Sequence, residues 1–175
     1  MSEQFFTVGH SDRPIDAFIA LLRSAGIENV VDVRRLPGSR RHPQFDEDSL
    51  RESLRAAGIR LDRIAELGGR RPVSKVVPFE TNAFWQNRSF HNYADHALSD
   101  DFRTGLDRLL AIGSERRTTV MCSEAVWWRC HRRIIADHLL ARGEEVFHLM
   151  GRERRQPAEL TEGAVVDGTD VVYPA

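Results

Sequence analysis

The chain has 175 residues, of which 41% are hydrophobic and 29% are charged, the proportions of a single globular domain rather than of a disordered or fibrous protein. Its formal net charge of −1 argues against a protein built to neutralise nucleic-acid phosphates, although a local basic surface could still bind nucleic acid. No apolar run approaches the roughly 20 residues that span a bilayer, and residues 1–10 lack the features of a signal peptide, so we expect a cytoplasmic protein without membrane contact.

The cysteines and the arginines stand out in this composition. The chain has two cysteines, which we expect to be free thiols, because a domain of this size folds without a disulfide framework. Of the 25 basic residues only Lys75 is a lysine, so the positive charge is almost all guanidinium, which suits bidentate pairing with carboxylate or phosphate. A compositional bias of the source genome is the simpler explanation of the arginines.

Strand and helix patterns alternate along the chain. Short apolar and β-branched runs predict strands at residues 4–9, 29–34, 59–64, 118–122 and 145–149. Apolar residues at helical spacing predict helices between residues 12 and 26, 46 and 58, 87 and 98, 99 and 110, and 128 and 142. The order predicts a single α/β domain, residues 1–175, with a mostly parallel sheet and helices on both faces in a Rossmann-like three-layer arrangement.

Two segments lack this regularity. Residues 70–86 contain two prolines and predict a long surface excursion that could act as a lid. Residues 151–175 form a C-terminal tail, in which we expect a basic loop at residues 151–156 and a small hairpin around the Asp-Gly pair at 167–168.

The second predicted strand carries an acid that needs a partner. By the two-residue period of a strand, Asp32 and Arg34 point to the same side, and an unpaired buried carboxylate would cost several kcal/mol. Arg34, or His10 at the end of the first strand, could supply the partner. Asp32 and Arg34 are therefore either an internal ion pair that orients the following loop or direct ligands.

The carboxyl ends of parallel strands meet at one edge of a sheet, where open α/β sheets usually bind ligands. In this chain that edge collects His10, Ser11, Arg34 and residues 122–124. The loop after the second strand adds four basic or titratable side chains, Arg35, Arg40, Arg41 and His42. These form either an anion-binding site or a solvated charged loop.

Cys130 and His131 are expected in the first turn of the helix after residues 118–122, where free backbone N–H groups favour an anion and lower a thiol pKa. The alternative is an inert buried thiol beside a core histidine, because His131 aligns with the apolar face of that helix. The two cysteines with His131 and His10 could in principle hold zinc. The cysteine spacing matches no common structural zinc pattern, so we expect no metal and infer no cofactor.

Several segments carry a resemblance to one family. They are VGHSDRP, DVRRLPGSRRHPQF, LGGRR, FHNYADHAL and MCSEAVWWRCHRRIIADHLL followed by VFHL. In this order they resemble the motifs of the domain-of-unknown-function family numbered 488 over nearly the whole chain. The resemblance implies a compact α/β domain and transfers these site positions: His10, Ser11, Asp32, Arg34, Ser39, Arg40, Phe45, Gly68, Gly69, Tyr93, Cys122, Glu124, Cys130, His131 and Arg132. The family implies no agreed reaction.

We expect first an enzyme that hydrolyses or transfers a group of an anionic or nucleotide-like small molecule, with Glu124 as general acid, base or nucleophile. The catalytic candidates are Glu124, Cys130, His131, Cys122 and His10. The substrate-binding candidates are Ser11, Asp32, Arg34, Ser39, Arg40, Arg132 and Tyr93. The alternatives are a module that binds phosphate or nucleic acid without chemistry, and a thiol redox sensor that uses both cysteines. The sequence predicts no oligomeric state.

Overall fold

The computed structural model describes residues 4–151 and 154–175 and folds them around a six-stranded sheet. The strands of this sheet are β1 (Gln4–Gly9), β2 (Asn29–Asp32), β3 (Arg60–Arg63), β4 (Thr118–Cys122), β5 (Glu145–Gly151) and β6 (Arg154–Pro157). They lie in the order β3-β2-β4-β1-β5-β6, and each neighbouring pair is parallel except β5 and β6. A separate hairpin consists of β7 (Val165–Asp167) and β8 (Asp170–Val172). The predicted α/β domain with a mostly parallel sheet is confirmed.

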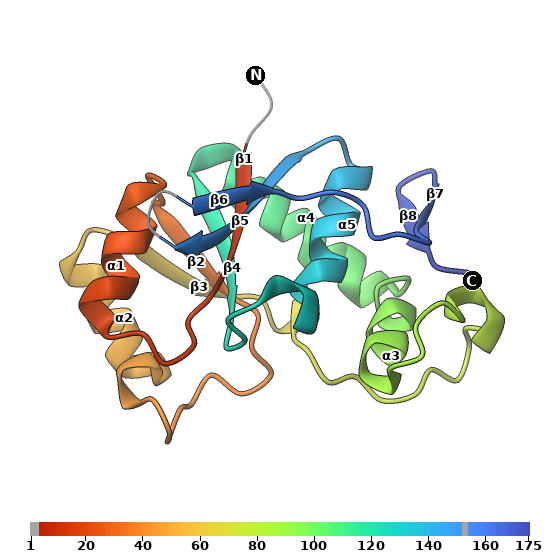
Figure 1. The fold of residues 1–175 in the computed structure, drawn as a ribbon, viewed down its shortest axis with the longest axis horizontal. Coiled ribbons are helices and arrows are strands. Elements are labelled where there is room, and N and C mark those ends of the chain that lie inside the picture. The colour runs from red at the N-terminus through yellow and green to blue at the C-terminus, as the bar shows by residue number, and fades with distance from the viewer. Residues whose placement is uncertain (1–3, 152–153) are drawn as a thin grey trace.

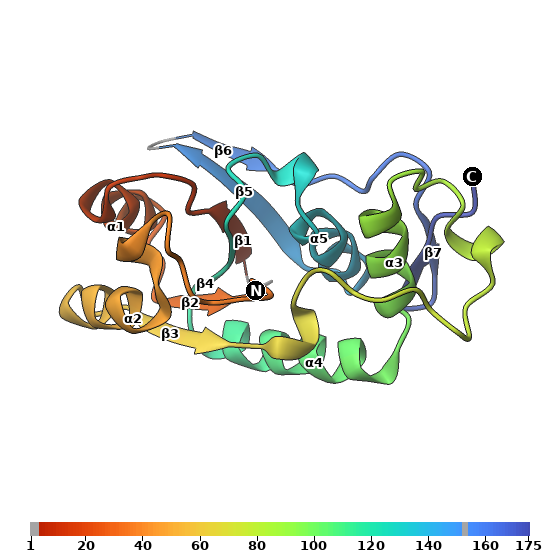
Figure 2. The same cartoon turned by 90° about the horizontal axis from the view of Figure 1, so that it is seen from below.

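Helices cover both faces of the sheet (Figure 1 and Figure 2). The α-helices are α1 (Ile15–Ser24), α2 (Glu47–Ala56), α3 (Arg88–His96), α4 (Asp100–Glu115) and α5 (Arg132–Ala141). Short 3-10 helices lie between them: η1 (Pro43–Phe45), η2 (Ala65–Leu67), η3 (Phe79–Asn82) and η4 (Trp127–Arg129). Phe18 of α1 and Leu54 of α2 share one buried cluster with Val30 of β2, whereas Leu106 of α4 and Ile135 of α5 belong to the cluster on the other face. Within the described residues, no helix has both the length and the apolar character needed to cross a bilayer.

The connections from β1 and β4 leave the sheet toward opposite faces. β1 continues into α1 on one face, and β4 continues through η4 into α5 on the other. These strands are neighbours, paired in parallel from Phe5 and Thr118 to Gly9 and Cys122. Ligands of open α/β sheets bind where neighbouring connections diverge in this way, outside the carboxyl ends of the strands. The fold therefore brings the segments after Gly9 and Cys122 to the usual ligand position.

The beginning of α1 and the end of β2 differ from the sequence prediction. Pro14 is the N-cap residue of α1, so the helix begins at Ile15 and not at residue 12. Ser11 has a positive φ of 51°, which turns the chain before the helix begins. β2 ends at Asp32 because the Asp32 carboxylate accepts a hydrogen bond from the backbone N–H of Arg34 at 2.9 Å, which removes that group from the strand ladder.

Two predictions for the C-terminal third are wrong. The basic segment 151–156, expected as a loop, contributes β6, in which Arg155 pairs with Leu149 of β5, while residues 152–153 lie outside the described residues. The helix expected from residue 128 begins at Arg132. Residues 127–129 instead form η4, and Cys130 is extended, with φ of −130° and ψ of 148°.

The C-terminal tail is hydrogen-bonded to the excursion at residues 70–86, close to the end of that segment. Val76 in the middle of the excursion is 87% exposed. At its end, the Asn82 side chain is buried and accepts a hydrogen bond from the backbone N–H of Tyr173 at 3.0 Å. The Tyr173 hydroxyl donates to Asp137 of α5 at 2.6 Å. The tail thus ties the excursion to α5, beside α3 (Figure 1).

Replacing Gly113 of α4 should destabilise the fold. A Cβ at this position would overlap the Phe5 ring of β1, so we expect Gly113→Ala to lower the free energy of unfolding by about 1–3 kcal/mol through overpacking. This would exceed the gain of about 1 kcal/mol that alanine usually brings inside a helix. Urea unfolding measures the effect. Ser114→Ala, on the exposed neighbour, is the control and should stay within about 0.5 kcal/mol of wild type, and equal losses at both positions would contradict the packing argument.

Candidate functional site

A pocket of about 510 Å³ opens at the carboxyl ends of β1, β2 and β4. Its wall comes from the ends of these strands, the loop after β2, the turn before the excursion, the N-terminus of α3 and the segment before α5. The sequence-predicted candidates that line it are His10, Arg34, Ser39, Tyr93, Cys122, Glu124, Cys130 and His131. The candidates that do not line it are Ser11, Asp32, Arg40 and Arg132. The structure therefore brings most of the predicted residues into one pocket.

Arg34 forms an internal ion pair with Asp32. Its Nη2 lies 2.8 Å from Asp32 Oδ2, and its Nε donates to both carboxylate oxygens. Its Nη1 donates to the Phe45 carbonyl oxygen at 2.7 Å. The exposed fractions are 6% for Arg34 and 1% for Asp32. The pair therefore orients the loop after β2, and the donors of Arg34 are occupied inside the protein.

His10 is a neutral hydrogen-bonding group beside this ion pair. Its Nδ1 lies 2.8 Å from the Ser11 carbonyl oxygen and carries the proton, because its Nε2 lies 3.3 Å from Nη1 of Arg34, a group that can only donate. Burial lowers the pKa of His10 to about 4, against the opposing effect of the Ser11 hydrogen bond and with help from the charge of Arg34. His10 therefore stays uncharged at neutral pH.

Asp46 and Ser39 shape the loop after β2. Asp46 is the N-cap residue of α2, but its carboxylate accepts a hydrogen bond from the Ser39 N–H at 3.1 Å and not from the helix. Ser39 Oγ in turn accepts from the His42 N–H at 3.1 Å. Ser39 and His42 line the pocket, whereas Arg40 is exposed outside it. Only part of this basic loop therefore faces the pocket.

Arg132 is fully buried and binds the segment that follows β4. Its Nη1 donates to Cys122 Sγ and to the Glu124 carbonyl oxygen, each at 2.6 Å, and its Nη2 donates to the Ala125 carbonyl oxygen at 3.2 Å. Among the described residues, no carboxylate lies within ion-pair distance of this guanidinium. A buried cation without a counter-charge is costly. A thiolate on Cys122 is the anion that can balance it.

Cys130 precedes α5 and does not lie in its first turn. Its sulfur accepts from the backbone N–H of Arg132 at 3.5 Å and lies 3.5 Å from Nδ1 of His131. His131 is the N-cap residue, and its Nε2 lies 2.9 Å from the Val33 carbonyl oxygen, so Nε2 carries the proton and Nδ1 can accept from the Cys130 thiol. Burial lowers the pKa of His131 to about 4. The Cys130–His131 pair is therefore a neutral thiol beside a neutral imidazole.

The two thiols differ in proton affinity. Burial alone would raise the pKa of Cys122, but its hydrogen bond with Cys130 and the charge and hydrogen bond of Arg132 together lower that pKa to about 7. Burial, followed by the interaction with Cys122, raises the pKa of Cys130 well above the ordinary value. The thiol expected from the sequence to be activated by the helix is thus the less acidic one, and Cys122 is the thiolate near neutral pH.

Tyr93 and Gly69 fix the position of His131. The Tyr93 hydroxyl donates to the Leu67 carbonyl oxygen at 2.7 Å, and its ring centroid lies 4.8 Å from that of His131. A Cβ at Gly69 would lie 2.8 Å from His131 Nδ1, closer than real Cβ contacts allow. The glycine pair noted in the sequence therefore serves a close approach of backbone to imidazole.

Glu124 contacts the interior through its backbone and the pocket through its side chain. Its carbonyl oxygen accepts from Arg132 and lies 3.6 Å from Cys122 Sγ. A Cβ at Gly9 would overlap that oxygen, so the end of β1 must be glycine. The Glu124 carboxylate is exposed and lines the pocket. The backbone contacts therefore hold an acidic side chain in the same pocket as Cys122.

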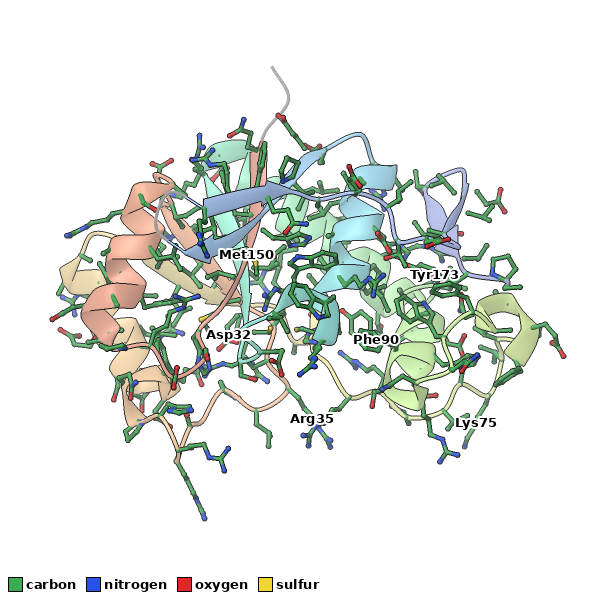
Figure 3. All side chains as sticks on the ribbon, in the orientation of Figure 1. Asp32, Arg35, Lys75, Phe90, Met150 and Tyr173 are labelled. Atoms are coloured by element: carbon green, nitrogen blue, oxygen red, sulfur yellow. The ribbon has the colours of Figure 1, made fainter. Side chains whose placement is uncertain are left out.

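Three exposed arginines complete the pocket wall, and we call them the arginine rim: Arg35, Arg70 and Arg129. Their side chains form no hydrogen bond or ion pair with other described residues. Arg35 projects outward from its loop, away from the buried Asp32 (Figure 3). Sequence reasoning noted Arg35 only as part of a charged loop and missed the other two. In the sequence, only the positions of these two arginines could have indicated a place in the pocket: Arg70 follows the glycine pair, and Arg129 precedes Cys130.

The start of α3 also lines the pocket, and of this helix only Tyr93 was predicted as a site residue. Asn87, Ser89 and Phe90 all face it. The Asn87 side chain accepts from the backbone N–H groups of Ser89 and Phe90 at 2.9 and 3.2 Å, so it caps α3. Nothing in the local sequence indicates that this helix end meets the strand ends, because their contact depends on how the excursion packs.

Within residues 4–151 and 154–175, no group of three or more histidine, cysteine or carboxylate side chains is arranged to hold a metal ion. The two sulfur atoms and the His131 imidazole are instead hydrogen-bonded to one another or to Arg132. The described residues thus offer no coordination site at the pocket.

The fold and the pocket define an α/β protein with two thiols at the carboxyl edge of a mostly parallel sheet. The family model described as Domain of unknown function DUF488 matches residues 14–139. The match covers most of the chain, so the protein belongs to this family, as the sequence motifs indicate. No curated protein and no solved structure gives a significant match. The family description names no reaction, so the chemistry of the pocket must supply the function.

A pH titration of the thiols should show one step near pH 7. As the pH rises through about 7, Cys122 loses its proton and the ultraviolet absorbance of the thiolate increases, whereas Cys130 contributes only at much higher pH. Cys122→Ser should remove the step. Cys130→Ala should keep it but move it to higher pH, because alanine has no donor to replace the hydrogen bond that stabilises the thiolate. A step that persists in Cys122→Ser would contradict the assignment of the thiolate.

Proposed function

We propose that the protein is an enzyme of the reducing cytoplasm that hydrolyses or transfers a group of an anionic or nucleotide-like small molecule. The observation that carries this proposal is the 2.6 Å contact between the Arg132 guanidinium and Cys122 Sγ in the wall of an open pocket. A thiolate stabilised by a cation is a strong nucleophile. Both cysteines are free, which suits a compartment that keeps thiols reduced.

The arginine rim is the part of the pocket suited to bind a negatively charged substrate. Arg34 is paired with Asp32 and Phe45, Nη1 and Nη2 of Arg132 bind groups of the protein, Arg132 does not line the pocket, and Arg40 lies outside it. We therefore assign anion binding to Arg35, Arg70 and Arg129 in their place. Guanidinium groups that bind no protein acceptor can pair with a phosphate or carboxylate through two parallel hydrogen bonds.

Cys122 and Glu124 would divide the chemistry between them. Cys122 Sγ would attack the electrophilic carbon or phosphorus, while the bond to the leaving oxygen or nitrogen breaks and the Glu124 carboxyl group protonates the leaving atom. The Glu124 carboxylate would then take a proton from a water or alcohol that attacks the sulfur-bound intermediate and releases the thiolate. Glu124 thus acts first as an acid and then as a base.

The arginine rim also favours a second candidate, a module that binds a phosphate-bearing ligand or a nucleic-acid end without chemistry. Binding of this kind should be salt-sensitive, because it depends on charges exposed to solvent. Binding of this kind should persist when Cys122 or Glu124 is replaced, because it uses neither side chain. Turnover by the wild-type protein therefore separates the two candidates.

Substitutions at Cys122 and Glu124 test the chemistry. A screen of phosphate esters, nucleotides and anionic amides with wild-type protein first identifies a substrate that is turned over. Cys122→Ser should then lower kcat on the order of 10⁴-fold or more, and Glu124→Gln should lower kcat by about 10²-fold. KM should change little, because neither side chain binds the anion. Full activity of Glu124→Gln would exclude its acid–base role, and full activity of Cys122→Ser would exclude the thiolate mechanism.

Arg35→Gln and Arg40→Gln form a matched pair in one loop. Arg35 lines the pocket and Arg40 does not, although both are exposed. Arg35→Gln should raise KM and reduce the dependence of kcat/KM on salt, because one charge that attracts the substrate is gone. Arg40→Gln should leave both unchanged. Equal effects of the two substitutions would contradict the assignment of the arginine rim.

A further inference from the structure

Cys130 forms no bond to the substrate in the proposed reaction, yet it lines the same pocket as Cys122. The chain has no other cysteine, and the sulfur atoms of both contact Arg132. We propose that Cys122 and Cys130 form a two-cysteine peroxide site, in which Cys122 reduces a hydroperoxide and Cys130 then closes a disulfide with it. This inference shares the Cys122 thiolate with the proposed function but requires neither the arginine rim nor Glu124.

Arg132 holds both sulfur atoms at once. Its guanidinium donates to Cys122 Sγ at 2.6 Å, and its backbone N–H donates to Cys130 Sγ at 3.5 Å. Both cysteines also line the same pocket. Two cysteines can close a disulfide when their Cα atoms lie within about 7 Å of each other, and a shared contact residue favours such an approach. One residue therefore positions the attacking and the resolving sulfur together.

The two sulfurs are also chemically unequal, as such a reaction requires. Cys122 is the thiolate, because Arg132 balances its charge, whereas Cys130 keeps its proton. Nδ1 of His131 lies 3.5 Å from Cys130 Sγ and can take that proton when Cys130 reacts. A site built only for hydrolysis could use the second thiol as a hydrogen-bond donor to the thiolate, but it would not need a base directed at that thiol.

Access to the sulfurs limits the oxidant to a small molecule. The exposed fractions are 3% for Cys122 and 7% for Cys130, although both line the pocket. A hydroperoxide is small and uncharged, so it can reach the floor of the pocket without contacts to the rim. A second protein thiol cannot approach as closely, which favours a disulfide within one chain over a disulfide between chains.

The proposed reaction balances in two steps. Cys122 thiolate attacks the terminal oxygen of the hydroperoxide, the O–O bond breaks, and the departing alkoxide or hydroxide takes a proton from solvent, leaving a sulfenic acid on Cys122. Cys130 then gives its proton to His131 and attacks the Cys122 sulfur. The S–O bond breaks, hydroxide leaves as water with that proton, and a disulfide remains. Two thiols are oxidised and one peroxide is reduced, and an external dithiol reductant returns the thiols.

The test exposes the reduced full-length protein to one equivalent of hydrogen peroxide without any substrate. In wild type we expect both thiols to disappear from a thiol-reagent count, with the mass loss of two hydrogens and no dimer on a non-reducing gel. In Cys130→Ser the resolving thiol is missing, so dimedone should trap a sulfenic acid on Cys122. In Cys122→Ser the Cys130 thiol should remain free. Cys130→Ala repeats the trapping experiment if the serine variant folds poorly.

Three outcomes would overturn the proposal: free thiols that persist in wild type, disulfides that form only between chains, or a Cys130→Ser variant in which dimedone labels nothing. Because the assay contains no substrate, its failure can be separated from failure of the proposed function. Wild-type turnover of an anionic substrate without disulfide formation would overturn the peroxide site alone. Disulfide formation in a protein that turns over no compound of the screen would support the peroxide site and count against the proposed function.

Discussion

The site depends on one constraint, the complete burial of Arg132 without a carboxylate partner among the described residues. A guanidinium in this position must be satisfied by acceptors, and it takes the carbonyl oxygens of Glu124 and Ala125 and the sulfur of Cys122. The carbonyl groups supply dipoles, but only the sulfur can supply a full negative charge. The buried cation therefore shapes the segment after β4 and sets the ionisation of the thiol at its end.

The same contacts explain why α5 begins late. The Arg132 side chain reaches back to residues 124 and 125, and Trp127 stacks on His148 of β5 with ring centroids 4.5 Å apart. These anchors hold the chain against the sheet, so it cannot continue one regular helix from residue 128. The extended Cys130 that results places its sulfur against the backbone N–H of Arg132, whose side chain contacts Cys122. Late helix initiation and the paired thiols thus have one cause.

The sequence predicts the order of elements and the convergence of strand ends because both follow from short-range patterns. The strands at residues 4–9 and 118–122 have the predicted bounds, since their apolar β-branched runs are sharply delimited. It cannot distinguish a buried arginine from a free one: Arg34 and Arg129 have the same chemistry, and only packing shows which has partners. The motifs indicate Tyr93 of α3, but they cannot predict that the start of α3 also reaches the pocket, because that approach depends on contacts such as Asn82 with Tyr173, which are 91 residues apart.

The division of the arginines into buried and exposed groups has an electrostatic consequence. A bare thiolate would repel an anionic substrate, but Arg132 balances the charge of Cys122 at contact distance, so the pair presents little net charge to the pocket. The arginine rim then acts on the substrate alone, with three positive charges opposed by the single carboxylate of Glu124. Attraction of an anion and activation of a nucleophile would be incompatible if one arginine served both. Placing them at different depths allows a negatively charged molecule to approach a negatively charged sulfur.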